Sequence, residues 1–86
     1  MKIKIFSTTW CPDCLRSKAY LDKNNIAYEV IDIEKQPEFV ELVQELNGGN
    51  QTVPTIVITY DDGSEKILAE PHNDVLQSAI DLKSNK

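Results

Sequence analysis

The sequence lacks the features that mark membrane, exported and nucleic-acid-binding proteins. No apolar run approaches the ~20 residues that a membrane-spanning helix needs. The first segment, 1–6, lacks the long apolar stretch and small-residue cleavage site of a signal peptide. The net charge is −5 and Lys and Arg form no cluster, which disfavours nucleic acids and anionic membrane surfaces as partners. We therefore expect a soluble cytoplasmic protein that binds neither membranes nor nucleic acids.

Cysteine is also scarce, because the chain has only two, Cys11 and Cys14. Small secreted domains use several cysteines to close long loops, whereas a bridge between these two would close almost none. Zinc needs about four ligands, and His72 lies far from the pair in sequence. The pair therefore indicates redox chemistry with no resident metal, although a cluster bridged between two subunits remains an alternative.

Glycine and proline are too few for a disordered or low-complexity chain. There are 3 Gly and 4 Pro, against 41% apolar and 27% charged residues, which is typical of a folded globular protein. A chain of 86 residues suffices for one domain and is too short for two. We expect a single domain over residues 1–86.

The hydrophobic pattern predicts the element order β-α-β-α-β-β-α. Strands are predicted at 2–6, 26–33, 55–60 and 65–69. Helices are predicted from Pro12 to Asn24–Asn25, from 36–38 to the stop at 47–49, and from 71–73 onward. A strand–helix–strand start implies a parallel pair, and the turn at 61–64 adds an antiparallel hairpin. This order predicts an α/β fold with a four-stranded mixed sheet and helices on both faces.

Each predicted helix has an expected apolar face. The apolar residues of the first helix fit the helical period only fairly well, whereas those of the second helix have the i, i+3, i+4, i+7 pattern of an amphipathic helix. The expected residues are Leu15, Ala19 and Leu21 in the first helix, Phe39, Leu42, Val43 and Leu46 in the second, and Val75, Leu76, Ala79 and Ile80 in the third.

The motif Trp10-Cys11-Pro12-Asp13-Cys14 lies where the first strand turns into the first helix. Pro12 fits the first helical position, which places Cys11 at the N-cap. There, free backbone N–H groups and the helix dipole stabilise the thiolate, which is the nucleophilic form. Cys14 lies one turn further, more buried and less ionised, within reach of Cys11. We predict that Cys11 attacks disulfides and that Cys14 resolves the mixed disulfide.

Two neighbours of the cysteines allow alternative interpretations. Asp13 would repel a thiolate or help move a proton to or from the second cysteine, with Arg16 and Lys18 offsetting its charge. The simpler interpretation is an acidic first-turn residue that the helix dipole favours. Trp10 has polar neighbours, which favours an exposed docking surface over a core position.

A second motif, Thr52-Val53-Pro54-Thr55, precedes the third strand. Pro54 is either a strand-start proline, which removes no inner hydrogen bond from the sheet, or a cis proline beside the cysteines. A cis proline would expose the backbone of Val53 for pairing with a substrate peptide. It would also exclude a metal from the site.

These segments resemble the glutaredoxin branch of the thioredoxin superfamily over nearly the whole chain. The resemblance is carried by residues 6–14, 28–33 and 48–55, and its specific signal is the combination of Cys-Pro-x-Cys with Thr-Val-Pro. The stretch 47–55 and the lead into Cys11 are similar to the mycoredoxins, which use mycothiol. The chain differs from the common glutaredoxin pattern at three places. These are Thr8, near which many glutaredoxins carry a basic residue, Asp13, where tyrosine is common, and 68–74, where a Gly-Gly-Cys/Ser-Asp sequence grips glutathione.

The resemblance implies a thioredoxin-like fold and a thiol–disulfide oxidoreductase without a cofactor. It implies a cis Pro54 and a small thiol held along Thr52–Val53, with Trp10, Pro12 and Asp13 completing the binding surface. The implied reductant is mycothiol, glutathione or a thioredoxin-reductase-like flavoenzyme, and the implied substrates are disulfide-containing proteins. We expect a monomer. Two alternatives remain open, which are a dedicated electron donor to one partner such as a ribonucleotide reductase, and an iron–sulfur or metal-binding glutaredoxin-like protein.

Overall fold

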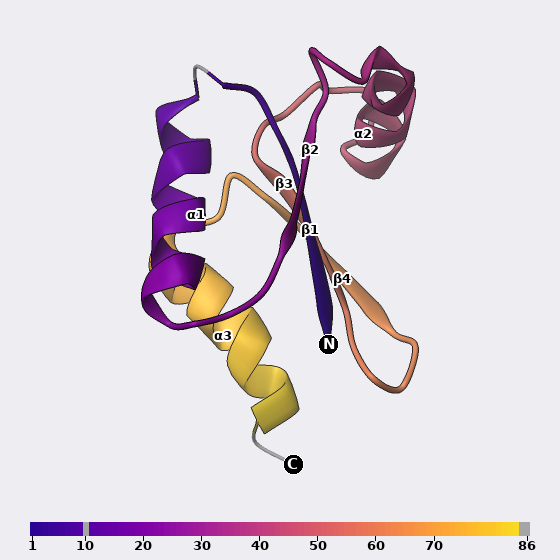
Figure 1. The fold of residues 1–86 in the computed structure, drawn as a ribbon. Coiled ribbons are helices and arrows are strands. Elements are labelled where there is room, and N and C mark those ends of the chain that lie inside the picture. Colours follow the sequence, from indigo (N-terminus) through magenta and orange to yellow (C-terminus); the bar gives the residue numbers. More distant parts are fainter. Residues whose placement is uncertain (10, 85–86) are drawn as a thin grey trace.

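The structure, a computed structural model, describes residues 1–9 and 11–84, with side chains up to residue 80. Its elements follow the predicted order β-α-β-α-β-β-α (Figure 1). They are β1 (Lys2–Ser7), α1 (Pro12–Lys23), β2 (Glu29–Asp32), the 3₁₀ turn η1 (Pro37–Phe39), α2 (Val40–Leu46), β3 (Thr55–Thr59), β4 (Glu65–Ala69) and α3 (Asn73–Ser84). No helix within the described residues is long and apolar enough to cross a membrane.

The four strands form one mixed sheet in the order β2-β1-β3-β4. Strand β1 pairs in parallel with β2 and antiparallel with β3, and β3 pairs antiparallel with β4. The α/β fold predicted from the sequence is therefore confirmed. Phe6 is opposite Thr55 in the register, so the end of β1 and the start of β3 lie at the same edge of the sheet.

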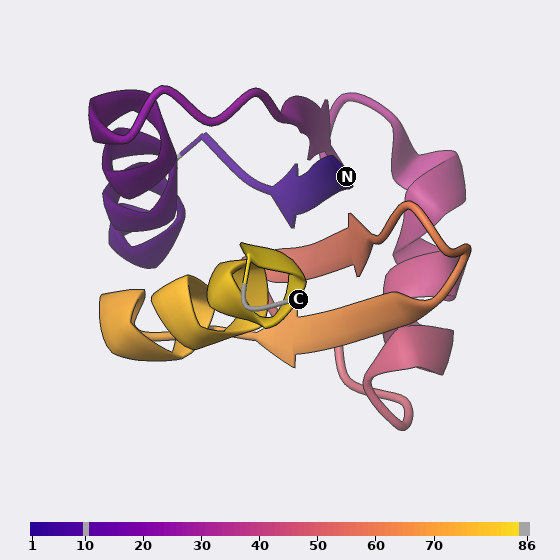
Figure 2. The same cartoon turned by 90° about the horizontal axis from the view of Figure 1, so that it is seen from below.

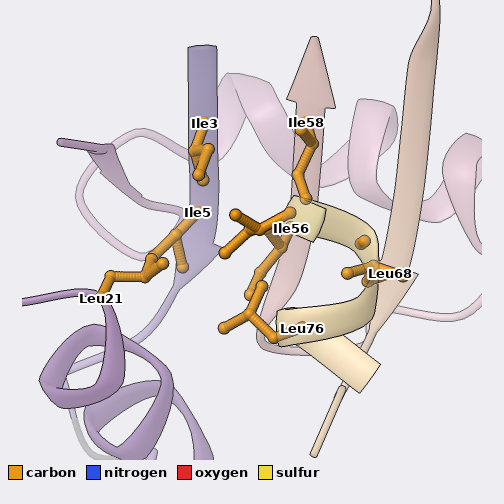
Figure 3. Packing of buried hydrophobic residues seen from close by; sticks show 9 residues of the cluster. Ile3, Ile5, Leu21, Ile56, Ile58, Leu68 and Leu76 are labelled. Carbon is orange, nitrogen blue, oxygen red and sulfur yellow. The ribbon is translucent and has the colours of Figure 1, made fainter. Parts of the chain in front are cut away.

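Helices cover both faces of the sheet, as Figure 2 shows, with α1 and α3 on one face and α2 on the other. Alternate residues of β1 face opposite layers, so Ile5 packs toward α1 and α3 while Phe6 packs toward α2. The larger cluster is shown in Figure 3 and consists of Ile3, Ile5, Leu21, Ile56, Ile58, Leu68, Leu76, Ala79 and Ile80. The smaller cluster consists of Phe6, Ile31, Ile33 and Val43.

The second strand is shorter than the sequence predicts, because β2 begins only at Glu29 and Ile26 bonds back to the end of α1. Asn25 adopts a left-handed φ of 56°. This conformation lets the N–H of Ile26 donate to the carbonyl of Leu21 at 2.9 Å, while the N–H of Asn25 donates to Asp22 at 3.1 Å. Asparagine takes here the position after the helix end that glycine usually occupies.

The predicted apolar faces are correct in part. In α1, Leu15 is 58% exposed and Ala19 is exposed. Leu21 is buried as predicted, and the other buried residues are Cys14 and Ser17. The three are spaced by three and four residues and so share one side of the helix. A serine therefore lies in the same buried row of α1 as one of the cysteines.

The other two helices each contain one exception. Val43 of α2 is buried, but Leu42 is 39% exposed. Leu76 of α3 is buried, but its neighbour Val75 is 44% exposed. Consecutive helical residues lie about 100° apart around the axis, so only one of each adjacent pair can face the sheet fully. The stop after α2 is confirmed, since Gly48 and Gly49 have φ values of 66° and 102°.

Candidate functional site

The two sequence motifs meet at one edge of the sheet. The chain leaves β1 at Ser7 and enters α1 at Pro12, while residues 52–54 lead into β3 next to it. In Figure 1 the start of α1 lies at the same end of the molecule as the turn from β1. The register of the sheet therefore brings together segments that are about forty positions apart in the chain.

Cys11 is the N-cap residue of α1, as predicted. Its backbone is extended, with φ −84° and ψ 113°, and Pro12 follows at the start of the helix. The Sγ atom of Cys11 accepts a hydrogen bond from the backbone N–H of Cys14 at 3.2 Å. A sulfur at this place faces N–H groups that have no partner inside the helix, together with the positive end of the helix dipole.

Cys14 lies deeper than Cys11, with 0% of its surface exposed against 4%, and neither cysteine forms a disulfide. Burial raises the pKa of the Cys14 thiol to about 12, and its hydrogen bond with Cys11 acts in the same direction. A backbone hydrogen bond with Thr8 and the charge of Lys18 oppose this rise in the pKa. Cys14 is therefore a protonated thiol at neutral pH.

Asp13 forms an ion pair with Arg16 on the next turn, with 3.2 Å between Oδ1 and Nη1. Both side chains are partly exposed, at 46% and 38%. The Nη2 atom of Arg16 also donates to the carbonyl of Pro71 at 3.4 Å, just before α3. The carboxylate between the cysteines thus has a partner charge, and the same arginine links the start of α1 to the segment that precedes α3.

The Val53–Pro54 peptide bond is cis, which confirms the second of the two interpretations of Pro54. The thiol of Cys11 donates to the carbonyl oxygen of Val53 across 3.8 Å, and this contact joins the two motifs. Pro54 is buried, while Thr52 and Val53 are half-buried.

Asn47 and Thr55, neither of which was predicted to be a site residue, hold this segment. The hydroxyl of Thr55 donates to the carbonyl of Thr52 at 2.6 Å. The side-chain amide of Asn47 donates to Thr55 Oγ1 at 2.9 Å and to the carbonyl of Val43 at 2.8 Å. Asparagine at the end of a predicted helix and threonine after a proline are residue types that cap and turn the backbone, and this was the available signal.

Of the predicted site residues, the structure brings together Cys11, Cys14 and the Val53–Pro54 pair. Pro12 is exposed at the start of α1. Trp10 lies outside the described residues. His72 is exposed and its carbonyl accepts the N–H of Leu76 at the start of α3. Within residues 1–9 and 11–84, no three His, Cys, Asp or Glu residues group so as to hold a metal ion.

The sequence is similar to known proteins of one family. Residues 3–62, which include both cysteines and Pro54, match the family model described as Glutaredoxin. A Mycobacterium tuberculosis protein with the provisional name glutaredoxin is 41% identical over 78 residues, covering 91% of this chain and 88% of its own. Mycoredoxin 1 of Corynebacterium glutamicum is 37% identical over 62 residues, covering 72% of this chain and 73% of its own.

Solved structures agree with the fold. The thioredoxin-like protein BC3987 superposes with a TM-score of 0.73 at 30% identity, covering 90% of this chain and 97% of that one. The crystal structure of a glutaredoxin from Archaeoglobus fulgidus gives a TM-score of 0.75 at 23% identity, with coverage of 92% and 85%. The architecture seen in Figures 1 and 2 is thus a thioredoxin-like one.

Proposed function

The chain belongs to the glutaredoxin family of thiol–disulfide oxidoreductases, and we propose that Cys11 and Cys14 carry out its exchange reaction with unequal roles. The Cys11 thiolate attacks one sulfur of a substrate disulfide, forms a mixed disulfide and displaces the other sulfur as a thiolate. Cys14 then attacks the Sγ atom of Cys11, releases the second substrate thiol and leaves a Cys11–Cys14 disulfide.

The observation that carries this proposal is the hydrogen bond from the Cys14 N–H to Cys11 Sγ at 3.2 Å. A thiolate at the helix N-cap keeps that donor and the favourable end of the helix dipole, whereas Cys14 is buried with a pKa of about 12. The same contact brings the two sulfurs within reach of each other, as the second step requires.

We assign the binding of substrate to the surface around Cys11. The carbonyl of Val53 lies 3.8 Å from Cys11 Sγ, so an extended chain that pairs with the backbone of Thr52 and Val53 would present its disulfide to that sulfur. Pro54 sets the conformation of this segment, and Trp10, Pro12 and Asp13 form the rest of the proposed surface.

For the reductant, we propose a low-molecular-weight thiol, with mycothiol favoured over glutathione. Similarity to Mycoredoxin 1, whose name refers to that class of thiol, supports this choice. The segment before α3 supports it too, because Glu70 and Pro71 stand where a glycine-rich glutathione grip would be needed. We propose that the reaction takes place in the cytoplasm, where thiols are kept reduced.

The experiment compares Cys11→Ser with Cys14→Ser. We expect Cys11→Ser to abolish exchange, while Cys14→Ser keeps the monothiol reaction with mixed disulfides of a small thiol. Oxidised wild-type protein is then mixed with mycothiol, glutathione or a thioredoxin reductase system. Fastest reduction by mycothiol supports the proposed reductant, whereas faster reduction by the flavoenzyme identifies the flavoenzyme as the reductant instead. Full activity of Cys11→Ser would overturn the assignment of the nucleophile.

A further inference from the structure

Ser17 is a fully buried polar residue that the proposed reaction has not yet used. It lies on α1 and 0% of its surface is exposed. Its hydroxyl has no hydrogen-bond partner within the part of the chain that the structure describes. A buried hydroxyl without a partner destabilises a protein, and alanine forms helices better than serine does. Ser17 therefore makes the folded protein less stable than alanine would at this position, and packing alone does not explain why a serine is present.

The position of Ser17 relative to Cys14 suggests its use. Cys14 and Ser17 belong to the same buried row of α1 and are separated by three residues. Side chains with this separation have Cβ atoms about 5–6 Å apart, and helical side chains lean toward the N-terminus. The Ser17 side chain therefore leans over the turn that carries Cys14. Rotation about χ1 is enough to bring a hydroxyl and a thiol at this separation into contact.

Thr8, which directly follows β1, is a second polar neighbour of Cys14. Its backbone forms a hydrogen bond with Cys14, and its own hydroxyl is buried and unpartnered among the described residues. Two buried hydroxyls, those of Thr8 and Ser17, thus belong to residues near Cys14 and have unused hydrogen-bonding capacity.

Cys14 needs such a donor only during the resolving step. The buried thiol must lose its proton to attack Cys11, and burial disfavours the charged form. A hydroxyl that has no partner while Cys14 is a thiol can donate to the sulfur when it becomes a thiolate. A donor that strengthens its interaction as charge develops lowers the barrier of that step.

We propose that Ser17 is a catalytic residue of the resolving step, in which its hydroxyl donates a hydrogen bond to the sulfur of Cys14. The inference rests on the proposed function. In the step, the Cys14 S–H bond breaks and a Cys14–Cys11 disulfide bond forms. The bond between Cys11 and the substrate sulfur breaks, the substrate leaves as a thiolate, and that thiolate takes up the proton. Cys14 is oxidised, the substrate sulfur is reduced, and Ser17 is unchanged.

The test separates the two steps with one reagent, 5,5′-dithiobis(2-nitrobenzoate). Attack by Cys11 releases the first coloured thiolate, and resolution by Cys14 releases the second. In Ser17→Ala we expect the first phase at the wild-type rate and the second phase about tenfold slower, which corresponds to one unit in the pKa of the attacking thiol. Ser78→Ala is the matched control, because Ser78 is an exposed serine on α3. It should leave both phases unchanged.

The pH dependence of the second phase distinguishes a chemical role from a structural one. In the second phase Cys11 is bonded in the mixed disulfide and carries no charge, so the charge of the chain that acts on Cys14 is that of Lys18, with the Asp13–Arg16 pair on the same helix. Residues 7–9 and 52–54 bring no charge, and Glu70 and His72 are exposed before α3. None of these changes in Ser17→Ala, so we expect the rising limb of the profile to move by about one pH unit toward higher pH.

The stability of the variant provides a second, independent readout. Ser17→Ala should unfold at the same temperature as wild type or above it, since it removes an unpartnered buried hydroxyl. A slower second phase in a protein that is at least as stable supports the inference. A second phase at the wild-type rate overturns it, as does an equal slowing of both phases. If wild type gives no second phase, or Cys11→Ser keeps the first phase, the proposed function fails instead.

Discussion

The backbone N–H of Cys14, in the first turn of α1, lies 3.2 Å from the sulfur of Cys11, the N-cap residue of that helix. This one contact joins a sulfur at the helix N-cap to a buried thiol. The two cysteines share a helix but differ in environment, since Cys11 is next to the Val53 carbonyl and Cys14 is enclosed.

The first prediction concerns alkaline pH. Burial raises the pKa of Cys14 from 9.0 to about 12. Above pH 9 the unfolded chain loses this proton while the folded protein keeps it, so stability falls as pH rises. Burial also raises the pKa values of Tyr28 and Tyr60, which act in the same direction. Urea unfolding is measured from about pH 8 to about pH 11, which lies below the pKa of Cys14 in the folded protein. Over this range the free energy of unfolding should fall less steeply in Cys14→Ser than in wild type. Equal slopes would contradict the prediction.

The second prediction concerns the charge between the cysteines. Asp13→Asn removes the charged partner of Arg16 and leaves an uncompensated positive charge on the first turns of α1, the helix that Cys11 caps. We expect exchange with anionic disulfides such as glutathione disulfide to accelerate a few-fold, while exchange with uncharged disulfides changes little. The free energy of unfolding should change by less than ~1 kcal/mol, because the pair is partly exposed. Stopped-flow rates at low and high salt provide the check, since added salt should remove the difference.

The third prediction concerns the support of the segment 52–54. Asn47→Ala loses the bonds to Thr55 Oγ1 and to the Val43 carbonyl. We expect a loss of ~1–3 kcal/mol in unfolding free energy and a higher KM for disulfide substrates, with a smaller change in kcat. Asn50→Ala is the control, because Asn50 is exposed and its side-chain bond is 3.5 Å long. A KM equal to that of wild type in Asn47→Ala would show that the segment needs no such support.

The fourth prediction compares two leucines of α1 that differ in exposure. Leu21 is fully buried and Leu15 is 58% exposed. Leu21→Ala should cost ~2–5 kcal/mol of unfolding free energy, because it removes core contacts and leaves a cavity. Leu15→Ala should change stability by no more than ~0.5 kcal/mol. Denaturant titrations measure both, and similar losses in the two variants would mean that α1 packs on the sheet by a different face.

Local rules predicted most of the elements. Pro12 and the cysteine before it mark the start of α1, and the glycines after residue 47 mark the end of α2, because helix caps depend on neighbours in sequence. The second strand was predicted too long, since Asn25 and Ile26 complete the end of α1 with backbone bonds. The exposed Leu15 and the buried Ser17 reversed an expectation based on hydrophobicity alone. Which side of α1 meets the sheet depends on how the chain leaves β1.

The spacing of Cys11 and Cys14 was enough to indicate a reactive thiol and its partner, because residues three apart at a helix start are neighbours whatever the rest of the fold does. The tertiary structure decided what surrounds them. The pairing of Phe6 with Thr55 brings the Val53 carbonyl to Cys11, and the packing of α1 on the sheet buries Cys14 with Ser17. These contacts join segments distant in sequence or depend on the orientation of a whole helix, and such relationships form only when the chain packs into one core.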